Sequence, residues 1–135
     1  RIKEMMHRGI NYAVAHDCVM DPWYAGGSHD MLEVAHMGLH VGQMTGVHET
    51  ADMFNAVTVN PARTLQLEGY GLDVDCNADL VVLQAKDPTE AIRLRANRLF
   101  VVRRGEVISR TPLLESEVHF MGEDALTRFS VSEFQ

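Results

Sequence analysis

The chain has 135 residues, 46% of them hydrophobic, and a formal net charge of -7 at pH 7. This length and apolar content suit one ordinary globular core, whereas the negative charge argues against non-specific nucleic-acid binding, which requires a basic face. No apolar run approaches the roughly 20 residues of a membrane-spanning helix, and there is no signal-peptide pattern, so we expect no membrane partner and, from the charge, no nucleic-acid partner. The two cysteines form no CxxC motif, which favours a reducing, cytoplasmic compartment.

The first predicted elements are a short helix and a buried strand. Residues 2–8 look like the end of a helix, with Gly9 placed as its C-terminal cap. Residues 10–15 are nearly continuously apolar, as expected for a parallel strand that is covered on both faces. A helix, a glycine and a buried strand in this order are typical of an α/β unit. Because the sequence begins at Arg1 rather than Met, we also expect a fragment of a longer protein.

Three helices are predicted next. Ser28 is a good N-cap for a helix that runs to about Thr45, and a second helix is expected over residues 51–57. Asn60 and Pro61 restart a short helix, with asparagine as the cap and proline at the first position. Together these helices are expected to cover one edge of a sheet.

From Gly69 onward the composition predicts a small β-rich module. A polar, glycine-bearing turn opens it, and the apolar run that follows has the pattern of a strand. The predicted elements are, in order, a strand over residues 78–83, a helical turn over 87–94, a hairpin over 98–109 with Gly105 at its bend, and an extended or partly ordered tail over 114–135.

A carboxylate directly follows the predicted N-terminal strand. Residues 17–27 are expected to form a loop, because they contain Pro22 and a Gly-Gly pair. In parallel α/β sheets and barrels, catalytic groups gather at the carboxyl ends of strands, and Asp17 occupies such a position. There it could bind a cation and take a proton from a metal-bound water. The alternative is that Asp17 only caps a turn.

Two further side chains of this loop are candidates for a binding site. Trp23 could form a pocket wall that stacks on a flat heteroaromatic ligand, or it could fill a gap in the core beside Pro22. Cys18 could act as a nucleophile only with a base beside it. His16 is expected to point to the opposite face of the strand and to play a supporting role. A small pocket-lining side chain is therefore the expected role of Cys18.

His36 and His40 lie four residues apart on the long predicted helix, a spacing that can place two imidazoles on one metal ion. No glutamate follows His36, so this is not the metalloprotease motif, and no third ligand is evident. Packing or solvent contact is the favoured interpretation for both histidines.

Several short motifs follow one another along the chain. They are His16-Asp17, the sequence TVNPAR over 58–63, Gly71, the sequence ADLVVL over 78–83 and the hairpin sequence VVRRGEV over 101–107. In this order they resemble the C-terminal part of the amidohydrolase superfamily over residues 10–110. Within that superfamily, the pattern HDxVxDPWY from His16, followed by GxxxMLxxxHMGLHxxQ from Gly27, is similar to the bacterial cytosine deaminases. Each motif alone is weak, and the ordered set is what carries the resemblance.

The resemblance implies an α/β fold, the C-terminal part of a metal-dependent (β/α)₈ barrel, together with strands of a small β-sandwich. Residues 1–68 would supply the last strand and C-terminal helices of the barrel, 69–112 the C-terminal strands of the sandwich, and 113–135 a tail. One divalent metal ion, zinc or iron, is implied as the cofactor. The family's other metal-binding histidines and its catalytic glutamate lie on earlier strands, so the missing N-terminal barrel portion is an expected partner.

By position, Asp17 matches the family's metal-ligating aspartate, which also takes a proton from the attacking water, and Trp23 matches a substrate-pocket tryptophan. Cys18 stands where the cytosine deaminases carry a second acidic residue near the pyrimidine ring, so Cys18 is expected to contact the substrate.

The expected reaction is deamination of a small heterocycle, cytosine to uracil and ammonia, by a homo-oligomeric enzyme. Isocytosine, creatinine or triazine-type substrates are alternatives, and so is a non-catalytic fragment without the remaining ligands.

Overall fold

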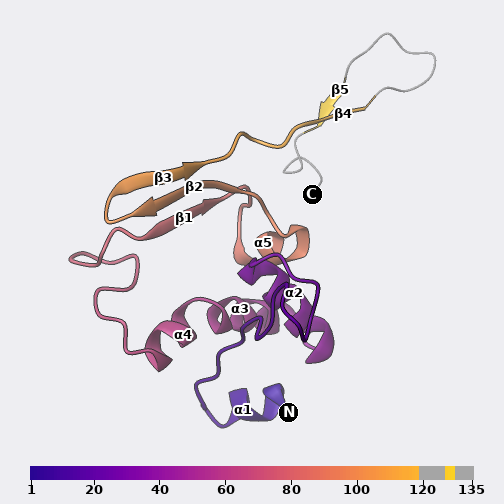
Figure 1. The fold of residues 1–135 in the computed structure, drawn as a ribbon. Coiled ribbons are helices and arrows are strands. Elements are labelled where there is room, and N and C mark those ends of the chain that lie inside the picture. The colour runs from indigo at the N-terminus through magenta and orange to yellow at the C-terminus, as the bar shows by residue number, and fades with distance from the viewer. Residues whose placement is uncertain (119–126, 130–135) are drawn as a thin grey trace.

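The computed structural model describes residues 1–118 and 127–129 as a group of helices with a small antiparallel sheet beside them (Figure 1). The three-stranded sheet has the order β1-β2-β3, and β4 pairs with β5 in a second, two-stranded sheet. None of the described helices is both long and apolar enough to cross a bilayer. The helices are α1 (Ile2–His7), α2 (Met31–Val41), α3 (Val47–Ala56), α4 (Val59–Thr64) and α5 (Pro88–Leu94), and the strands are β1 (Leu80–Leu83), β2 (Arg98–Arg103), β3 (Glu106–Arg110), β4 (Ser116–Val118) and β5 (Thr127–Phe129).

The predicted N-terminal helix is confirmed, and Gly9 ends it as expected. Gly9 has a φ of +66°, the left-handed conformation that glycine adopts without a steric cost. The amide of Ile10 donates to the carbonyl of Met5 at 3.0 Å, and the amide of Gly9 donates to that of Met6 at 2.9 Å. This pair of bonds is the Schellman arrangement, which satisfies the last carbonyls of a helix.

The predicted strand over residues 10–15 is wrong for the described residues, because this segment is extended but belongs to neither sheet. Its Val14 amide donates to the carbonyl of Ala56 at the end of α3, and Tyr12 is buried against the helices. A strand needs a neighbouring strand to take up its backbone hydrogen bonds. The described part of the chain places helices beside this segment instead.

The long predicted helix is shorter than expected at both ends. It begins after Asp30, whose carboxylate accepts the amide of Leu32 at 2.7 Å and so takes the N-cap role predicted for Ser28. Aspartate is as good a cap as serine, and the Ser28 hydroxyl donates to Glu33 instead. The helix ends at Val41 rather than near residue 45.

The next two helices both begin earlier than predicted. Helix α3 starts at Val47 because the carboxylate of Glu49 accepts the Gly46 amide at 2.8 Å and stabilises the first turn. Helix α4 starts at Val59, with Thr58 rather than Asn60 at the N-cap position.

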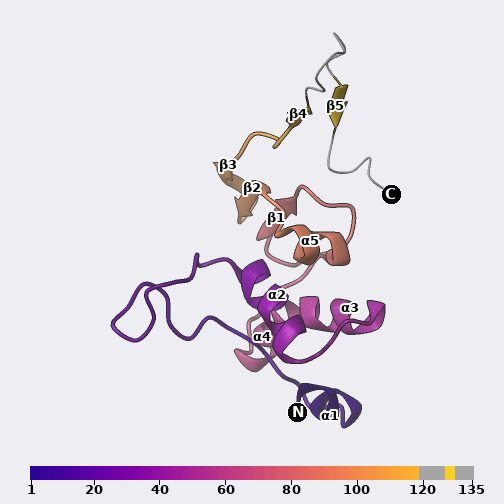
Figure 2. The ribbon, with the colours of Figure 1, turned by 90° about the vertical axis from the view of Figure 1, so that its right-hand side faces the viewer.

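The core lies between α2, α3 and α5. Its fully buried large side chains are Met44, Met53 and Ile92, which come from the α2–α3 connection, α3 and α5. Helices α2 and α3 approach closely at Gly38, where a Cβ atom would lie 2.8 Å from the sulfur of Met53. In both ribbon views α5 lies between the three-stranded sheet and the other helices (Figures 1 and 2). Helix α5 therefore brings the second half of the chain into the core of the first.

The predicted elements of the β-rich region are confirmed with small shifts. Asp87 caps α5 by accepting the amide of Glu90 at 2.7 Å, and Pro88 takes the first helical position. The β2–β3 hairpin turns at Arg104 and Gly105, which both have positive φ, as a tight two-residue turn requires. Of the predicted tail, β4 and β5 are paired strands, and residues 119–126 and 130–135 lie outside the described residues.

Candidate functional site

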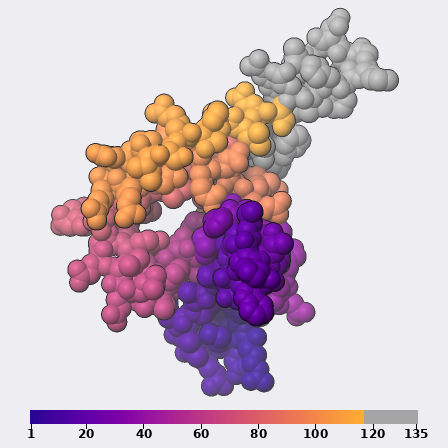
Figure 3. Space-filling view, in the orientation of Figure 1, coloured from indigo at the N-terminus to yellow at the C-terminus, as the bar shows by residue number. Residues whose placement is uncertain are grey.

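The three predicted site residues lie on one loop that follows the extended N-terminal segment. Figure 2 shows this dark purple loop projecting from the helices, and in the space-filling view it stands at the front of the molecule (Figure 3). Asp17, Cys18 and Trp23 therefore all lie in the loop expected over residues 17–27, and their roles in a site stay predictions.

Asp17 presents a free carboxylate at the start of this loop. Its side chain is exposed, and it enters none of the hydrogen bonds or ion pairs found among residues 1–118 and 127–129. Its backbone has a φ of +63°, a left-handed conformation that aspartate tolerates better than most residues. The turn-capping alternative therefore has no support from the described contacts, and the carboxylate is free to bind a ligand.

Asp21 gives the loop its shape. Its Oδ1 atom accepts the amides of Trp23 and Tyr24, each at 2.9 Å, and its own amide donates to the carbonyl of Tyr24 at 3.0 Å. The amide of Met20 donates to the carbonyl of Gly26 at 3.0 Å and closes the turn at its base. Sequence inspection missed this role of Asp21, although an aspartate two residues before a turn is a recognisable signal.

Trp23 lies at the tip of this turn with 88% of its surface exposed. It therefore fills no gap in the core that the described residues form. A large rigid ring held out on an ordered turn is suited to stacking on a flat ligand.

Cys18 is half-buried at the base of the loop. A hydrogen bond from its thiol to Asp21, followed by desolvation and the charge of Asp17, raises the pKa of Cys18. The thiol form is a poor nucleophile, and the pocket-lining role of Cys18 stays a prediction.

Asp30 and Arg98 form an ion pair at the far end of the loop. Both Nη atoms of Arg98 donate to the Asp30 carboxylate, one of them at 3.0 Å. His16 Nε2 donates to the backbone carbonyl of Asp30 at 3.1 Å. Burial alone would raise the pKa of Asp30, but the hydrogen bonds from Arg98 and the Leu32 amide and the charge of Arg98 together hold that pKa below its ordinary value. The sequence carried no signal for this pair, because its members are 68 residues apart.

His36 and His40 do lie side by side on α2, with ring centroids 4.6 Å apart. Burial, then the charges of His40 and Arg95, lower the pKa of His36. Nowhere in residues 1–118 and 127–129 do three or more His, Cys, Asp or Glu side chains gather closely enough to hold a metal ion. The pair is thus not part of a metal centre within these residues.

The resemblance implies a metal ion, and the ligands that the described residues offer for it can be compared with what such an ion needs. Asp17 offers one free, exposed carboxylate, which suits a divalent cation. The described part of the chain supplies no second and third ligand beside it. The residues therefore fit one position of a metal site and not a complete one.

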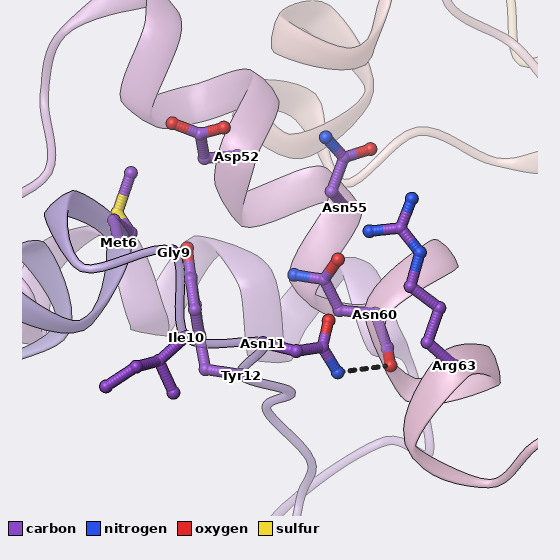
Figure 4. A pocket seen from close by; sticks show the side chains of 9 residues that line it. All are labelled: Met6, Gly9, Ile10, Asn11, Tyr12, Asp52, Asn55, Asn60 and Arg63. Atoms are coloured by element: carbon purple, nitrogen blue, oxygen red, sulfur yellow. Dashed lines mark hydrogen bonds between the residues drawn. The ribbon is translucent and has the colours of Figure 1, made fainter.

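A polar cavity of about 300 Å³ lies elsewhere, between the extended N-terminal segment and helices α3 and α4 (Figure 4). The side-chain amide of Asn11 donates to the backbone carbonyl of Asn60 beside the cavity. The hydroxyl of Tyr12 is buried without a hydrogen-bond partner among the described residues. None of the predicted site residues lines this cavity. Its lining residues are Met6, Gly9, Ile10, Asn11, Tyr12, Asp52, Asn55, Asn60 and Arg63.

Comparisons with known proteins place this arrangement in context. A profile described as Amidohydrolase family matches residues 1–110. The chain is 30% identical over 112 residues to N-isopropylammelide isopropyl amidohydrolase of Pseudomonas sp. (strain ADP), covering 82% of this chain and 28% of that protein. It is 32% identical over 111 residues to pterin deaminase of Rhizobium rhizogenes, covering 82% of this chain and 25% of that protein.

Two solved structures of deaminating or amidohydrolase enzymes are also similar to this chain. The 5-methylcytosine deaminase of Klebsiella pneumoniae liganded with 5-fluorocytosine is similar with a TM-score of 0.82 and 34% identity, over 89% of this chain and 29% of that chain. N-isopropylammelide isopropylaminohydrolase of Burkholderia multivorans is similar with a TM-score of 0.77 and 28% identity, over 81% of this chain and 28% of that chain. The chain thus spans less than a third of the length of these relatives.

Proposed function

Because the chain belongs to the amidohydrolase family, we propose that it forms the C-terminal part of a metal-dependent (β/α)₈-barrel enzyme that deaminates an aminated heterocycle by hydrolysis. The observation that carries the proposal is the projecting loop, which presents the free carboxylate of Asp17 and the exposed ring of Trp23 six residues apart. The similar proteins named as deaminases of pterin and 5-methylcytosine support the same reaction class.

In the proposed reaction, Asp17 would hold a divalent zinc or iron ion with its carboxylate, and the bound ion would make water a better nucleophile at neutral pH. The same carboxylate would accept the proton that the attacking water loses. The water oxygen bonds to the amino-bearing ring carbon, the carbon–nitrogen bond breaks, and the proton leaves with ammonia. Trp23 stacks on the ring and Cys18 lines the pocket beside it.

We propose cytosine as the substrate, with 5-methylcytosine as the second candidate. Cys18 is a small, neutral and weakly polar side chain, and the raised pKa of its thiol keeps it uncharged. A neutral ring, with or without a methyl group, is compatible with such a neighbour. The second candidate is included because a similar solved structure is that of a 5-methylcytosine deaminase.

Ammonia release tests this proposal. The full-length protein that carries this chain should release ammonia from cytosine or 5-methylcytosine faster than it releases ammonia from isocytosine, creatinine or pterin, and faster than it releases the alkylamine from an N-alkylated triazine. Turnover of one of the last four alone would replace the substrate proposal, and turnover of none would remove the deaminase proposal. The 135-residue chain by itself should release no ammonia, because Asp17 is one ligand of several that the proposed site needs. The oligomeric state and cytoplasmic location stay predictions.

Replacing Trp23 with alanine should raise the KM for the heterocycle by roughly tenfold, since stacking of a base on an aromatic ring contributes about 1–3 kcal/mol. Trp23→Phe keeps a flat ring and should raise KM much less. The folded state should be little affected in either variant, because Trp23 is 88% exposed. Steady-state kinetics with the preferred substrate gives the result, and an unchanged KM in Trp23→Ala would remove Trp23 from the binding site.

A further inference from the structure

We infer that Asp30 and Arg98 are positioning residues, an ion pair that ties the small sheet to the loop bearing Asp17 and fixes where that carboxylate points. This inference rests on the proposed function, which gives Asp17 its role. It gives Arg98 of β2 an indirect part in catalysis, although no residue of the β-rich region is predicted to contact the substrate or the metal ion.

The loop is held at both of its ends by one residue. At the C-terminal end, the Asp30 carboxylate caps α2 through the Leu32 amide at 2.7 Å. At the N-terminal end, the Asp30 carbonyl accepts His16 Nε2 at 3.1 Å, and His16 directly precedes Asp17 in the chain. A change in the position of Asp30 is therefore transmitted to Asp17 through one hydrogen bond and one peptide unit.

Arg98 fixes Asp30 from outside the helical region. Its guanidinium binds the carboxylate through two nitrogens, a two-point geometry that restricts rotation as well as distance. Arg98 is the first residue of β2, so the sheet sets its backbone position. The side chains of Asp30 and Arg98 are only 19% and 35% exposed, so water competes weakly for the pair, and removing Arg98 leaves a largely buried carboxylate without its counter-ion.

The carboxyl-bearing neighbours do not replace this link. Glu33, which also lies in the first turn of α2, is bonded to the Ser28 hydroxyl. Asp21 is occupied by the amides of Trp23 and Tyr24. Each of these contacts shapes one part of the loop, whereas Asp30 and Arg98 join the loop to the sheet.

Two variants of the full-length protein separate the ion pair from the helix cap. Arg98→Met removes the cation and keeps most of the side-chain length. Asp30→Asn removes the anion but keeps the cap, because asparagine is as good an N-cap as aspartate. Arg98→Lys restores charge without the two-point geometry. Lys3→Met is the matched control, because Lys3 pairs with Glu49 at 2.8 Å in a similarly half-buried ion pair that does not contact the loop.

The first readout is kinetic. Arg98→Met and Asp30→Asn should each lower kcat at least tenfold, the size expected when an outer partner of a ligand is lost, with a smaller change in KM. Arg98→Lys should recover part of the loss, and Lys3→Met should stay within twofold of the parent protein. If kcat per folded protein is unchanged in both variants, the pair is merely structural and the inference fails.

The second readout needs neither substrate nor activity. Hydrogen–deuterium exchange of a peptide covering residues 16–30 should speed up at least tenfold in Arg98→Met and Asp30→Asn, and not in Lys3→Met. Exchange rates equal to those of the parent protein would overturn the inference, whatever the kinetics show. If the parent protein deaminates no heterocycle, the proposed function fails, and the exchange data alone then decide whether the ion pair holds the loop. Should Arg98→Met not fold, Asp30→Asn gives both readouts.

Discussion

Asp17→Asn is expected to lower kcat of the full-length enzyme by at least about a thousandfold, or roughly 4 kcal/mol of transition-state stabilisation. The substitution removes the negative charge that the proposed mechanism uses twice, to hold the metal ion and to accept a proton. Asparagine tolerates the left-handed backbone that Asp17 adopts at a φ of +63°, so the loop should keep its shape. Steady-state kinetics, with circular dichroism to confirm folding, gives the result.

Asp17→Ala should lose a similar amount of activity but also cost about 1–2 kcal/mol of stability, because alanine is strained at a positive φ. Asp75 provides the control for that strain, since it too is exposed and has a φ of +67°. Asp75→Ala should therefore lose stability and keep its turnover per folded protein. Near-normal turnover by Asp17→Asn would remove Asp17 from the mechanism.

Ile92→Ala is expected to reduce the free energy of unfolding by about 2–5 kcal/mol, the usual cost of truncating a large buried aliphatic side chain. Ile92 has no exposed surface and lies in the cluster that joins α5 to α2 and α3. Chemical denaturation of the full-length protein measures the change.

Thr89→Ala is the matched control, because it truncates an exposed side chain to alanine in the same helix and should change stability by about 0.5 kcal/mol or less. Equal losses in the two variants would contradict the placement of α5 in the core.

Local chemistry was enough to predict the elements whose ends carry their own signals. Gly9 after α1, the Asp87-Pro88 start of α5 and the turn at Gly105 are each decided by backbone preferences or capping within a few residues. The start of the long helix differs from the prediction because two good caps, Ser28 and Asp30, lie near it. The structure uses Asp30, which is also bound by Arg98, 68 residues along the chain.

The failed strand prediction has a different cause. The apolar run over residues 10–15 has the composition of a buried strand. A strand forms only where a second segment takes up its backbone hydrogen bonds, and composition does not show whether such a segment lies beside it. Likewise, sequence placed Asp17 and Trp23 on one loop, but it could not show that the carboxylate is unbonded or that the ring is 88% exposed. Both properties depend on how the rest of the chain packs.

Helix α5 also determines the order in which the protein can fold during synthesis. Met53 needs Ile92 to complete its surroundings, and Ile92 leaves the ribosome 39 residues after Met53. Until then, the apolar faces of α2 and α3 stay open to water or to a chaperone. We therefore expect nascent chains stalled before residue 87 has left the ribosome to be digested rapidly by protease at α2 and α3, and chains long enough for residue 96 to have left the ribosome to be protected there.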